Sequence, residues 1–484
     1  MGLGAVDANA APVAAAQSAA VHSGLHRRQI ARILLAVGLG IILDDFVVFS
    51  NLSAVITKAF FPPGNPATEA LLFWGIFAVG FVARPAGSIL FGHIGDMYGR
   101  RPCLVATVSI MGVATVLIGC LPTYQMIGLA SPILLALLRL VQGLAMGGEF
   151  GCSLVYLHEV APPKRKGLSG SMGFAAAIGG IALGVALVMI VTAACTKEQL
   201  AVWGWRVPFL LASVTAVAAV LLRAHMQEPE EWTAAKRESD AAAKADAADA
   251  AAAPLSRAAR FRRQPFVALL TSNWWQLGLQ FLFEAAVSVS FWLCTSYLPG
   301  FFQKTVGLPA ELSLGMLLFN LIAMCPVIML SGWAADRPGF HRVVGALMAY
   351  GLSAAMSAPM FLAFQASKTA YTCWLLQLVY MLLLAWVLGM VPVSMSCLYP
   401  PTQRASGFNF GHNCAMSLMG GLAPTVVTAI GLTTGNTLTA PGFYMLACTL
   451  LSIVAGVAIT ILVPESNRSP KDPAADLAVA VEQA

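Results

Sequence analysis

Two short charged stretches interrupt an otherwise apolar chain: GHIGDMYGRRP at residues 92–102 and GWAADRPGFHR at residues 332–342. In both, an aspartate follows the first glycine by four positions, a second glycine follows the aspartate by three, and at least one arginine comes after it. Each stretch lies between long apolar segments, and a pattern that occurs twice indicates two related halves. The pattern is carried by Gly92, Asp96, Gly99, Arg100 and Arg101 in the first copy and by Gly332, Asp336, Arg337, Gly339 and Arg342 in the second.

The composition indicates the environment of the chain. Of its 484 residues, 58% are hydrophobic and only 10% are charged, and the mean hydropathy is +0.77. Soluble domains typically carry about 25% charged residues, so a water-soluble fold of this composition would expose too much apolar surface. We therefore expect a polytopic protein embedded in a lipid bilayer. The formal net charge of +6 is attributed to membrane topology, and no nucleic-acid partner is expected.

Long apolar segments predict the fold class. A bilayer core is about 30 Å thick and is crossed by about 20 apolar residues in a helix, because the backbone must satisfy its own hydrogen bonds there. The sequence predicts an all-α polytopic membrane protein with twelve transmembrane helices in two six-helix halves. The predicted spans are 31–58, 70–93, 102–121, 128–158, 168–194, 204–224, 268–301, 311–334, 341–365, 370–398, 405–432 and 439–463.

The predicted domain organisation has five parts. They are an N-terminal tail at 1–29, an N-terminal six-helix bundle at 30–225, a charged Ala-rich linker at 226–266, a C-terminal six-helix bundle at 267–464 and a C-terminal tail at 465–484. Basic residues concentrate in alternate connections between spans, and the other connections carry few. The positive-inside rule therefore places both termini, the linker and both charged stretches in the cytosol.

The charged stretches resemble the signature loop of the major facilitator superfamily, which reads G-x-x-x-D-[RK]-x-G-R-[RK]. The fourth predicted span adds R-x-x-Q-G, another motif of that superfamily, with Arg139 and Gln142. The resemblance implies a secondary transporter in which the two loops form a cytosolic gate that stabilises the outward-open state. The first copy departs from the signature at Met97, where a basic residue is usual, and the second has Phe340 and His341 where arginines are common.

Three longer stretches resemble the metabolite:proton symporter branch of this superfamily. They read FAVGFVARPAGSILFGHIGD at 77–96, WGWRVPFLL at 203–211 and YPPTQRASGFNFGHNCAMSLMGGLAP at 399–424. The branch includes carriers of citrate, oxoglutarate, shikimate and proline or betaine. The resemblance implies a bacterial inner-membrane protein that takes up a small metabolite, with the proton as coupling ion and no other cofactor.

The first span departs from this branch where proton coupling is expected. The branch typically reads G-N-x-x-E-W-[FY]-D-F, whereas residues 38–49 read GLGIILDDFVVF, with Ile42 in place of the glutamate and an additional acid at Asp44. A charge near mid-bilayer costs at least about 2.5–3.5 kcal/mol, so it requires an explanation. Our hypothesis is that Asp44 or Asp45 carries the transported proton, and Asp45 is preferred because it matches the branch. The alternative is a structural carboxylate capped by hydroxyl or backbone groups.

Two arginines inside predicted spans are candidate substrate ligands. A buried guanidinium that faces a polar cavity suits bidentate recognition of a carboxylate, so Arg84 and Arg139, the latter with Gln142, favour an anionic substrate. Arg84 lies close enough to the cytosolic side that a snorkelling role is the alternative. Arg139 alternatively forms a permanent salt bridge, for which an acid of the first span or Glu149 is available.

Four polar residues in spans of the second half complete the candidate cavity. Glu284 is flanked by small residues that suit a cavity wall. His412 titrates near neutrality and is a candidate for proton transfer, with a hydrogen-bonding packing role as the alternative. Asn320 and Asn413 are the remaining two.

These features predict a transporter and not an enzyme. Serine-hydrolase, zinc-protease and phosphate-loop motifs are absent from the sequence, and the 10 cysteines show no metal-ligand spacing. The expected function is proton-coupled import of an organic acid, such as a di- or tricarboxylate, by a monomer with alternating access. The alternatives are uptake of a zwitterion such as proline or betaine, proton-antiport export, and metabolite sensing. The fifth span, GFAAAIGGIALGVAL at 173–187, lacks the proline usual in exporters, and the short low-complexity tails disfavour a sensor.

Overall fold

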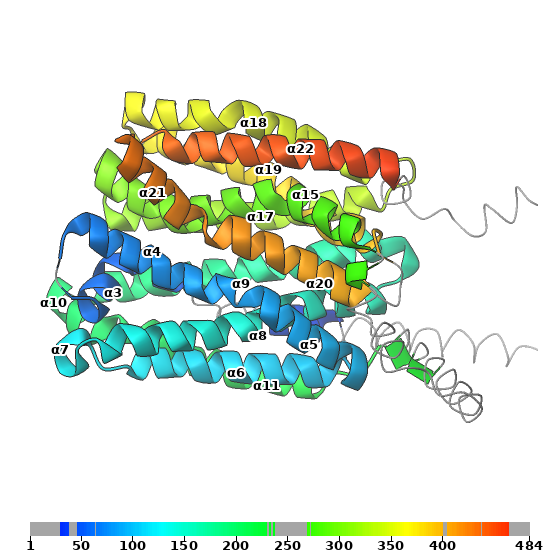
Figure 1. The fold of residues 1–484 in the computed structure, drawn as a ribbon, viewed down its shortest axis with the longest axis horizontal. Helices are drawn as coiled ribbons and strands as arrows, with labels where there is room; N and C mark the ends of the chain where they lie inside the picture. The colour runs from blue at the N-terminus through cyan, green and yellow to red at the C-terminus, as the bar shows by residue number, and fades with distance from the viewer. Residues whose placement is uncertain are drawn as a thin grey trace, which may run out of the picture.

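The computed structural model is a bundle of long helices, with no strand among the described residues (Figure 1). The structure describes residues 30–37, 46–62, 64–229, 232–233, 236–237, 269–271, 273–399, 404–436 and 438–463. Asp44 and Asp45, the acids expected to handle the proton, lie outside these ranges.

The elements follow one another along the chain in two groups. After a helical segment at 30–37, the first group contains α2 (Phe46–Asn51), α3 (Ser53–Phe60), α4 (Pro66–Val82), α5 (Arg84–Tyr98), α6 (Arg100–Cys120), α7 (Tyr124–Ile127), α8 (Ala130–Val160), η1 (Pro163–Arg165), α9 (Lys166–Ala194), α10 (Lys197–Gln199), η2 (Leu200–Gly204) and α11 (Arg206–Ala224). The second group contains α15 (Trp274–Trp292), η3 (Leu293–Tyr297), α16 (Leu298–Phe301), η4 (Phe302–Val306), α17 (Ala310–Ala335), α18 (Arg342–Ser367), α19 (Ala370–Ser396), α20 (Arg404–Cys414), η5 (Ala415–Gly421), α21 (Ala423–Thr434) and α22 (Ala440–Leu462).

Within the described ranges, 11 helical segments are long and apolar enough to cross a membrane. They coincide, to within a few residues, with the second to twelfth predicted spans, and they confirm an all-α multi-pass membrane protein. The first predicted span includes residues 38–45, which lie outside the described ranges, and its flanks at 30–37 and in α2 and α3 are helical. Large apolar side chains such as Val113 and Leu183 point outward from the bundle, as expected for a surface that faces lipid.

Local sequence signals explain several helix boundaries. Asn65 accepts a hydrogen bond from the Ala67 N–H, and Pro66 occupies the first position of α4, where a missing N–H costs nothing. Gly99 has a φ of +112°, a conformation that favours glycine, and it separates α5 from α6. The first charged stretch therefore breaks the helix at the second glycine of its pattern.

Two helices change their winding near the centre of the bundle. The helix α15 ends at Trp292 and continues as the π-helical segment η3, and α20 continues as the π-helical segment η5. A π-helical segment changes the direction of the side chains beside it and is frequent at functional sites. These two segments flank the cavity described below.

The two groups of helices meet along an extended seam. Figure 1 shows the elements up to α11 in the lower part and most of the second group above them. At the seam, α9 packs along α17 and α19, α20 packs against α5 and α8, and α4 packs against η5 and α21. Small residues permit this approach, because a Cβ on Gly332 would lie 2.1 Å from the Ser171 Oγ and a Cβ on Gly170 would lie 2.8 Å from Pro392.

The bundle has two distinct ends. One end carries the connections α5–α6 and α17–α18, which contain the charged stretches, and we call it the motif end. The other end, where α3 ends and α4 begins, is called the opposite end. In Figure 1 the opposite end lies on the left and the motif end on the right.

Candidate functional site

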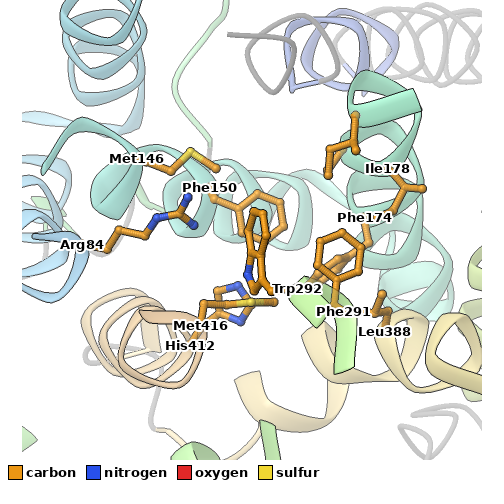
Figure 2. A pocket seen from close by; sticks show the side chains of 12 residues that line it. Arg84, Met146, Phe150, Phe174, Ile178, Phe291, Trp292, Leu388, His412 and Met416 are labelled. Atoms are coloured by element: carbon orange, nitrogen blue, oxygen red, sulfur yellow. The ribbon is translucent and has the colours of Figure 1, made fainter. Parts of the chain in front are cut away.

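A small cavity of about 60 Å³ lies at the seam and is lined by both halves (Figure 2). Helices α5, α8 and α9 contribute from the first half, and α15, α19, α20 and η5 contribute from the second. Its lining residues are Arg84, Met146, Phe150, Phe174, Ala177, Ile178, Ile181, Phe291, Trp292, Leu388, His412 and Met416. Two of them, Arg84 and His412, carry ionisable groups in an otherwise apolar wall.

Arg84 begins α5 and is only 4% exposed. Its Cζ lies 4.3 Å from the centroid of the Phe81 ring and 5.9 Å from that of Trp292. Aromatic faces stabilise a desolvated cation, so the two rings help to hold the guanidinium in the interior. Figure 2 shows this group extending toward Phe150 and Trp292, and because the side chain is buried, Arg84 does not snorkel.

The structure brings together two residues that were separate candidates in the sequence. The His412 Nδ1 lies 2.5 Å from Oε2 of Glu284, which is fully buried behind the cavity wall. The other carboxylate oxygen of Glu284 accepts a hydrogen bond of 2.8 Å from Gln280 Nε2, and Gln280 Oε1 accepts one of 2.7 Å from the Tyr399 hydroxyl. The Phe408 ring stacks on the imidazole at an interplanar angle of 6°. The histidine is thus fixed in place and linked to a buried acid.

Arg139 is fully buried but does not line this cavity. Its Nη1 donates to Gln142 Oε1 at 3.2 Å, and Gln142 Nε2 donates to the Thr115 hydroxyl at 2.7 Å. Its Cζ lies 3.8 Å from the centroid of Phe49 in α2, the helix that directly follows Asp45 in the chain. The R-x-x-Q-G motif therefore joins α8 to α6 and to the first span.

Glu149 is paired with a residue that the sequence analysis did not single out. Its Oε1 accepts from Arg223 Nη2 at 2.8 Å, and both side chains are at most 2% exposed. Arg223 also donates to the carbonyls of Leu104 and Ala36. The alternative in which Arg139 pairs with Glu149 is not realised, because Arg223 takes that place. Its charge near the end of the sixth apolar span was the available signal.

The two asparagine candidates have different surroundings. Asn413 donates to the Gly147 carbonyl at 3.0 Å across the seam and to the Asn409 side chain at 2.7 Å. Asn320 in α17 is fully buried, and its side-chain amide has no hydrogen-bond partner among the described residues. Neither asparagine lines the central cavity. Asn413 therefore joins the halves, and the role of Asn320 is not explained by its contacts.

The first copy of the repeated pattern forms a polar cluster at the motif end. Asp96 Oδ1 accepts from Arg100 Nη1 at 2.6 Å, and Arg100 Nη2 lies 3.1 Å from Glu159 Oε1. The other oxygen of Asp96 accepts from the Ser406 hydroxyl of α20 at 2.6 Å, across the seam. We call the Asp96–Ser406 bond the first motif contact.

The second copy reaches the other half through backbone groups. Asp336 accepts 2.8 Å hydrogen bonds from the N–H groups of Gly167 and Leu168 at the start of α9. These bonds form the second motif contact, and the helix dipole of α9 favours the carboxylate there. Burial raises the pKa of the Asp336 carboxyl from its ordinary value, while those N–H groups and the nearby Arg342 and Arg165 act in the opposite direction.

The other pattern residues have local roles. A Cβ on Gly99 would lie 2.5 Å from Glu228 Oε1. The Glu228 carboxylate accepts the backbone N–H of Arg101 at Oε1 and that of Arg100 at Oε2. Gly92 makes no such close approach, because a Cβ there would meet no atom within 4 Å. In the second copy, Arg337 stacks on Trp333, Gly339 takes a φ of +76°, and Arg342 Nε donates to the Ala335 carbonyl.

Glu228 was assigned to the linker in the sequence analysis, so its capping of α6 was missed. No signal in the linear sequence links it to Gly99, because 128 positions separate it from Arg100. Within the described part of the chain, no group of His, Cys, Asp or Glu side chains could hold a metal ion.

Two groups of membrane-length helices meet around a shared buried cavity. Comparison with known proteins identifies the class as a multi-pass membrane transporter of the major facilitator superfamily. Residues 36–471 match the family model described as "Sugar (and other) transporter", and the chain belongs to this family. It is 32% identical to the alpha-ketoglutarate permease of Escherichia coli K12, over 85% of this chain and 88% of the relative.

Two further comparisons agree with this assignment. The chain is 30% identical to the citrate-proton symporter of Klebsiella pneumoniae, over 85% of this chain and 87% of the relative. Its fold resembles that of the E. coli proton:xylose symporter XylE bound to 6-bromo-6-deoxy-D-glucose, with a TM-score of 0.73, 17% identity and coverage of 91% of this chain and 97% of the other. The resemblance of the sequence to the superfamily is thereby confirmed, and the chain is a transporter and not an enzyme.

Proposed function

We propose that this protein imports an organic acid together with protons by alternating access. The observation that carries the proposal is that Arg84 and the Glu284-linked His412 line one cavity formed by both halves. A cation for the substrate and a titratable group for the proton thus lie in the place that alternating access exposes to each side in turn.

Arg84 supports an anionic substrate. Its guanidinium can bind a carboxylate through two parallel hydrogen bonds, and a low-dielectric wall strengthens such charge-assisted bonds. The names of two relatives, an alpha-ketoglutarate permease and a citrate-proton symporter, refer to organic acids of this kind. A di- or tricarboxylate therefore suits the site better than an uncharged metabolite.

The Glu284–His412 pair supports proton coupling. With a neutral imidazole the pair carries one uncompensated negative charge, and a buried charge of this kind is costly. When Glu284 is ionised, His412 must donate to it through Nδ1–H, and a second proton on Nε2 then neutralises the pair. Asp44 and Asp45 of the first span remain proposed partners in proton transfer, and Asp45 precedes Phe49, which contacts Arg139, by four positions in the sequence.

The conformation supports a transport cycle that begins outside. Both motif contacts join the halves at the motif end, whereas a larger cavity of about 350 Å³ lies at the opposite end. The distribution of basic residues assigns the motif end, the linker and both termini to the cytosol of a bacterial inner membrane. In this assignment the structure is closed toward the cytosol, and the protein acts as a monomer.

The central cavity must expand to take its substrate. Its volume of about 60 Å³ is far below the roughly 300–1,000 Å³ typical of ligand pockets. Trp292 lines the cavity, and in Figure 2 its indole lies between the Phe150 and Met416 side chains, so this indole is the side chain whose movement would make room. Substrate binding is therefore expected to be coupled to a change in the aromatic side chains.

The test is uptake by proteoliposomes with an alkaline interior, with labelled 2-oxoglutarate, citrate, shikimate, proline and betaine. We expect accumulation of a carboxylate that a protonophore abolishes. The variant His412→Gln should lose accumulation but retain exchange of internal for external substrate, and Arg84→Lys should raise the apparent KM about 10-fold or more because the planar fork is lost. The exposed His93 of α5 provides the matched control, His93→Gln, and should behave as wild type.

Three results would contradict the proposal. Accumulation of proline or betaine without any carboxylate would show that the substrate is a zwitterion. Accumulation only under the reversed gradient would show export. Gradient-driven accumulation by His412→Gln would show that the proton binds elsewhere.

A further inference from the structure

The larger cavity at the opposite end has a wall of unusual charge. It is lined by both halves, and Lys58 of α3 and Lys304 of η4 both contribute to its wall. The chain has four lysines on the side that the topology assigns to the exterior, and the other two, Lys197 and Lys368, do not line this cavity. Half of the external lysines therefore face one cavity.

The two lysines occupy corresponding places in the two halves. Lys58 lies near the end of the first span of the first half, and Lys304 lies near the end of the first span of the second half. Glu69 of α4 is the one acidic side chain of the wall, and one of its oxygens accepts the Gly64 N–H. The wall thus carries two positive charges and one negative charge, with the negative charge partly engaged by the backbone.

The cavity has the size of a binding site. Its volume of about 350 Å³ lies within the range of roughly 300–1,000 Å³ for ligand pockets, whereas the central cavity is about 60 Å³. Trp74 and Tyr297 form part of its wall with ring centroids 6.2 Å apart, and the hydroxyl-bearing residues Thr57 and Thr305 line it as well. A small organic acid fits here before any rearrangement of the centre.

A layer of rings separates this cavity from the central one. Trp74 packs edge-to-face on Phe77 at 5.3 Å, and Phe77 and Phe81 of the first half meet Trp292 of the second at 6.0 and 4.7 Å. We call these four residues the aromatic layer. Trp74 borders the outer cavity and Trp292 borders the central one, so a ligand in the outer cavity waits on the far side of the layer from Arg84.

We propose that this cavity, which we call the vestibule, is a first binding site for the substrate anion, held by Lys58 and Lys304 before the aromatic layer opens. The proposal rests on the proposed function in that it takes the substrate to be a carboxylate. A pair of lysines in a concave wall raises the local concentration of an anion and accelerates its capture. A two-site path follows, in which the vestibule selects for charge and the central cavity performs the coupled step.

The test measures binding at the lysines directly. In sealed proteoliposomes of the full chain, a membrane-impermeant amine-acylating reagent should modify the four external lysines, and peptide mass spectrometry should give a rate for each. Citrate or 2-oxoglutarate is expected to slow the modification of Lys58 and Lys304 by about threefold or more at low ionic strength, with no effect on Lys197 and Lys368. Sodium chloride at equal ionic strength is the control for screening of the lysine charges. Glucose, which is uncharged, is the control for occupation of the cavity by a neutral solute.

Variants connect this site to transport. Lys58→Gln/Lys304→Gln should raise the apparent KM for external carboxylate about 2- to 10-fold at low salt, with kcat unchanged, because two exposed charges are removed. The matched control Lys197→Gln/Lys368→Gln should leave the KM unchanged. Raising the salt concentration should weaken uptake by wild type more than uptake by the vestibule variant.

The outcomes separate the two proposals. Equal modification rates with and without carboxylate would overturn the vestibule site, even if carboxylate uptake is observed. Selective protection of Lys58 and Lys304 without any carboxylate uptake would support the vestibule as an anion site and contradict the proposed function.

Discussion

Glu149 and Arg223 show how single residues balance charge inside the first half. Two ions removed from water lose several kcal/mol of hydration each, and the loss is offset only by close pairing and further hydrogen bonds. Arg223 is closely paired with Glu149, and it makes further hydrogen bonds to the carbonyls of Leu104 and Ala36. Neither member lines the central cavity or the vestibule, so we assign the pair to stability.

Substitution of one member should be more harmful than substitution of both. Arg223→Gln leaves the Glu149 carboxylate buried without its cation and is expected to lower the free energy of unfolding by about 3–5 kcal/mol. Glu149→Gln/Arg223→Gln should lose less than Arg223→Gln alone. Unfolding of the purified protein in mixed detergent would measure this, and an equal loss in both variants would show that the pair is not coupled.

The sequence identified single residues better than their partners. A charge inside an apolar span is visible from hydropathy alone, which is how Arg84, Glu284 and His412 were found. Their partners depend on packing: 128 positions separate Glu284 from His412, and the sequence carries no sign that their side chains touch. Arg223 carried the same signal as Arg84 and could have been found by the same criterion.

At the scale of helices, hydropathy predicted the spans well because a bilayer sets their length. The α17 helix, Ala310–Ala335, differs by one residue at each end from the predicted span 311–334. The π-helical segments η3 and η5 were not predicted, because their apolar sequences do not differ from those of regular helices. Met416 of η5 lines the central cavity and Tyr297 of η3 lines the vestibule, so helix prediction was weakest beside the two cavities.

Gly332 offers a test of the seam between α9 and α17. A Cβ there would lie 2.1 Å from the Ser171 Oγ and 2.7 Å from the Gly167 carbonyl oxygen, so Gly332→Ala should separate the helices and weaken the second motif contact. Distance measurements between spin labels on the two halves at the motif end should show fewer closed molecules. Gly351→Ala is the matched control, because a Cβ there meets no atom within 4 Å. An unchanged distance distribution in Gly332→Ala would contradict this account.

At the scale of the whole molecule, the two motif contacts hold the same end of the bundle closed. Asp96 uses a hydroxyl of α20, and Asp336 uses the first N–H groups of α9. Both aspartates belong to the repeated pattern, and each engages the half of the chain that does not contain it. The gate at this pattern stays a prediction, and the sequence could not predict that Gly167 and Leu168 are the partners of Asp336.

The Asp336 contact predicts a pH dependence of closure. Burial raises the pKa of Asp336 in the closed state, and opening returns the carboxyl to water and to its ordinary pKa. The protonated, neutral carboxyl of Asp336 therefore favours closure. The closed fraction should rise as the pH at the motif end falls from the raised pKa toward the ordinary pKa, and it should level off below the ordinary pKa. Spin-label distances measured as a function of pH would show this rise. Asp336→Asn should abolish it, and a closed fraction that falls on acidification would contradict the prediction.

The aromatic layer also has a consequence for energy conservation. Protons move along chains of hydrogen-bonded water, and a packed apolar constriction excludes such chains. Phe77, Phe81 and Trp292 connect Trp74 of the vestibule to the central cavity of His412, so the layer would electrically insulate the proposed proton site while the carrier waits without cargo. Idle carriers would then leave the membrane's proton gradient intact, and the gradient would be consumed only in cycles that also move substrate.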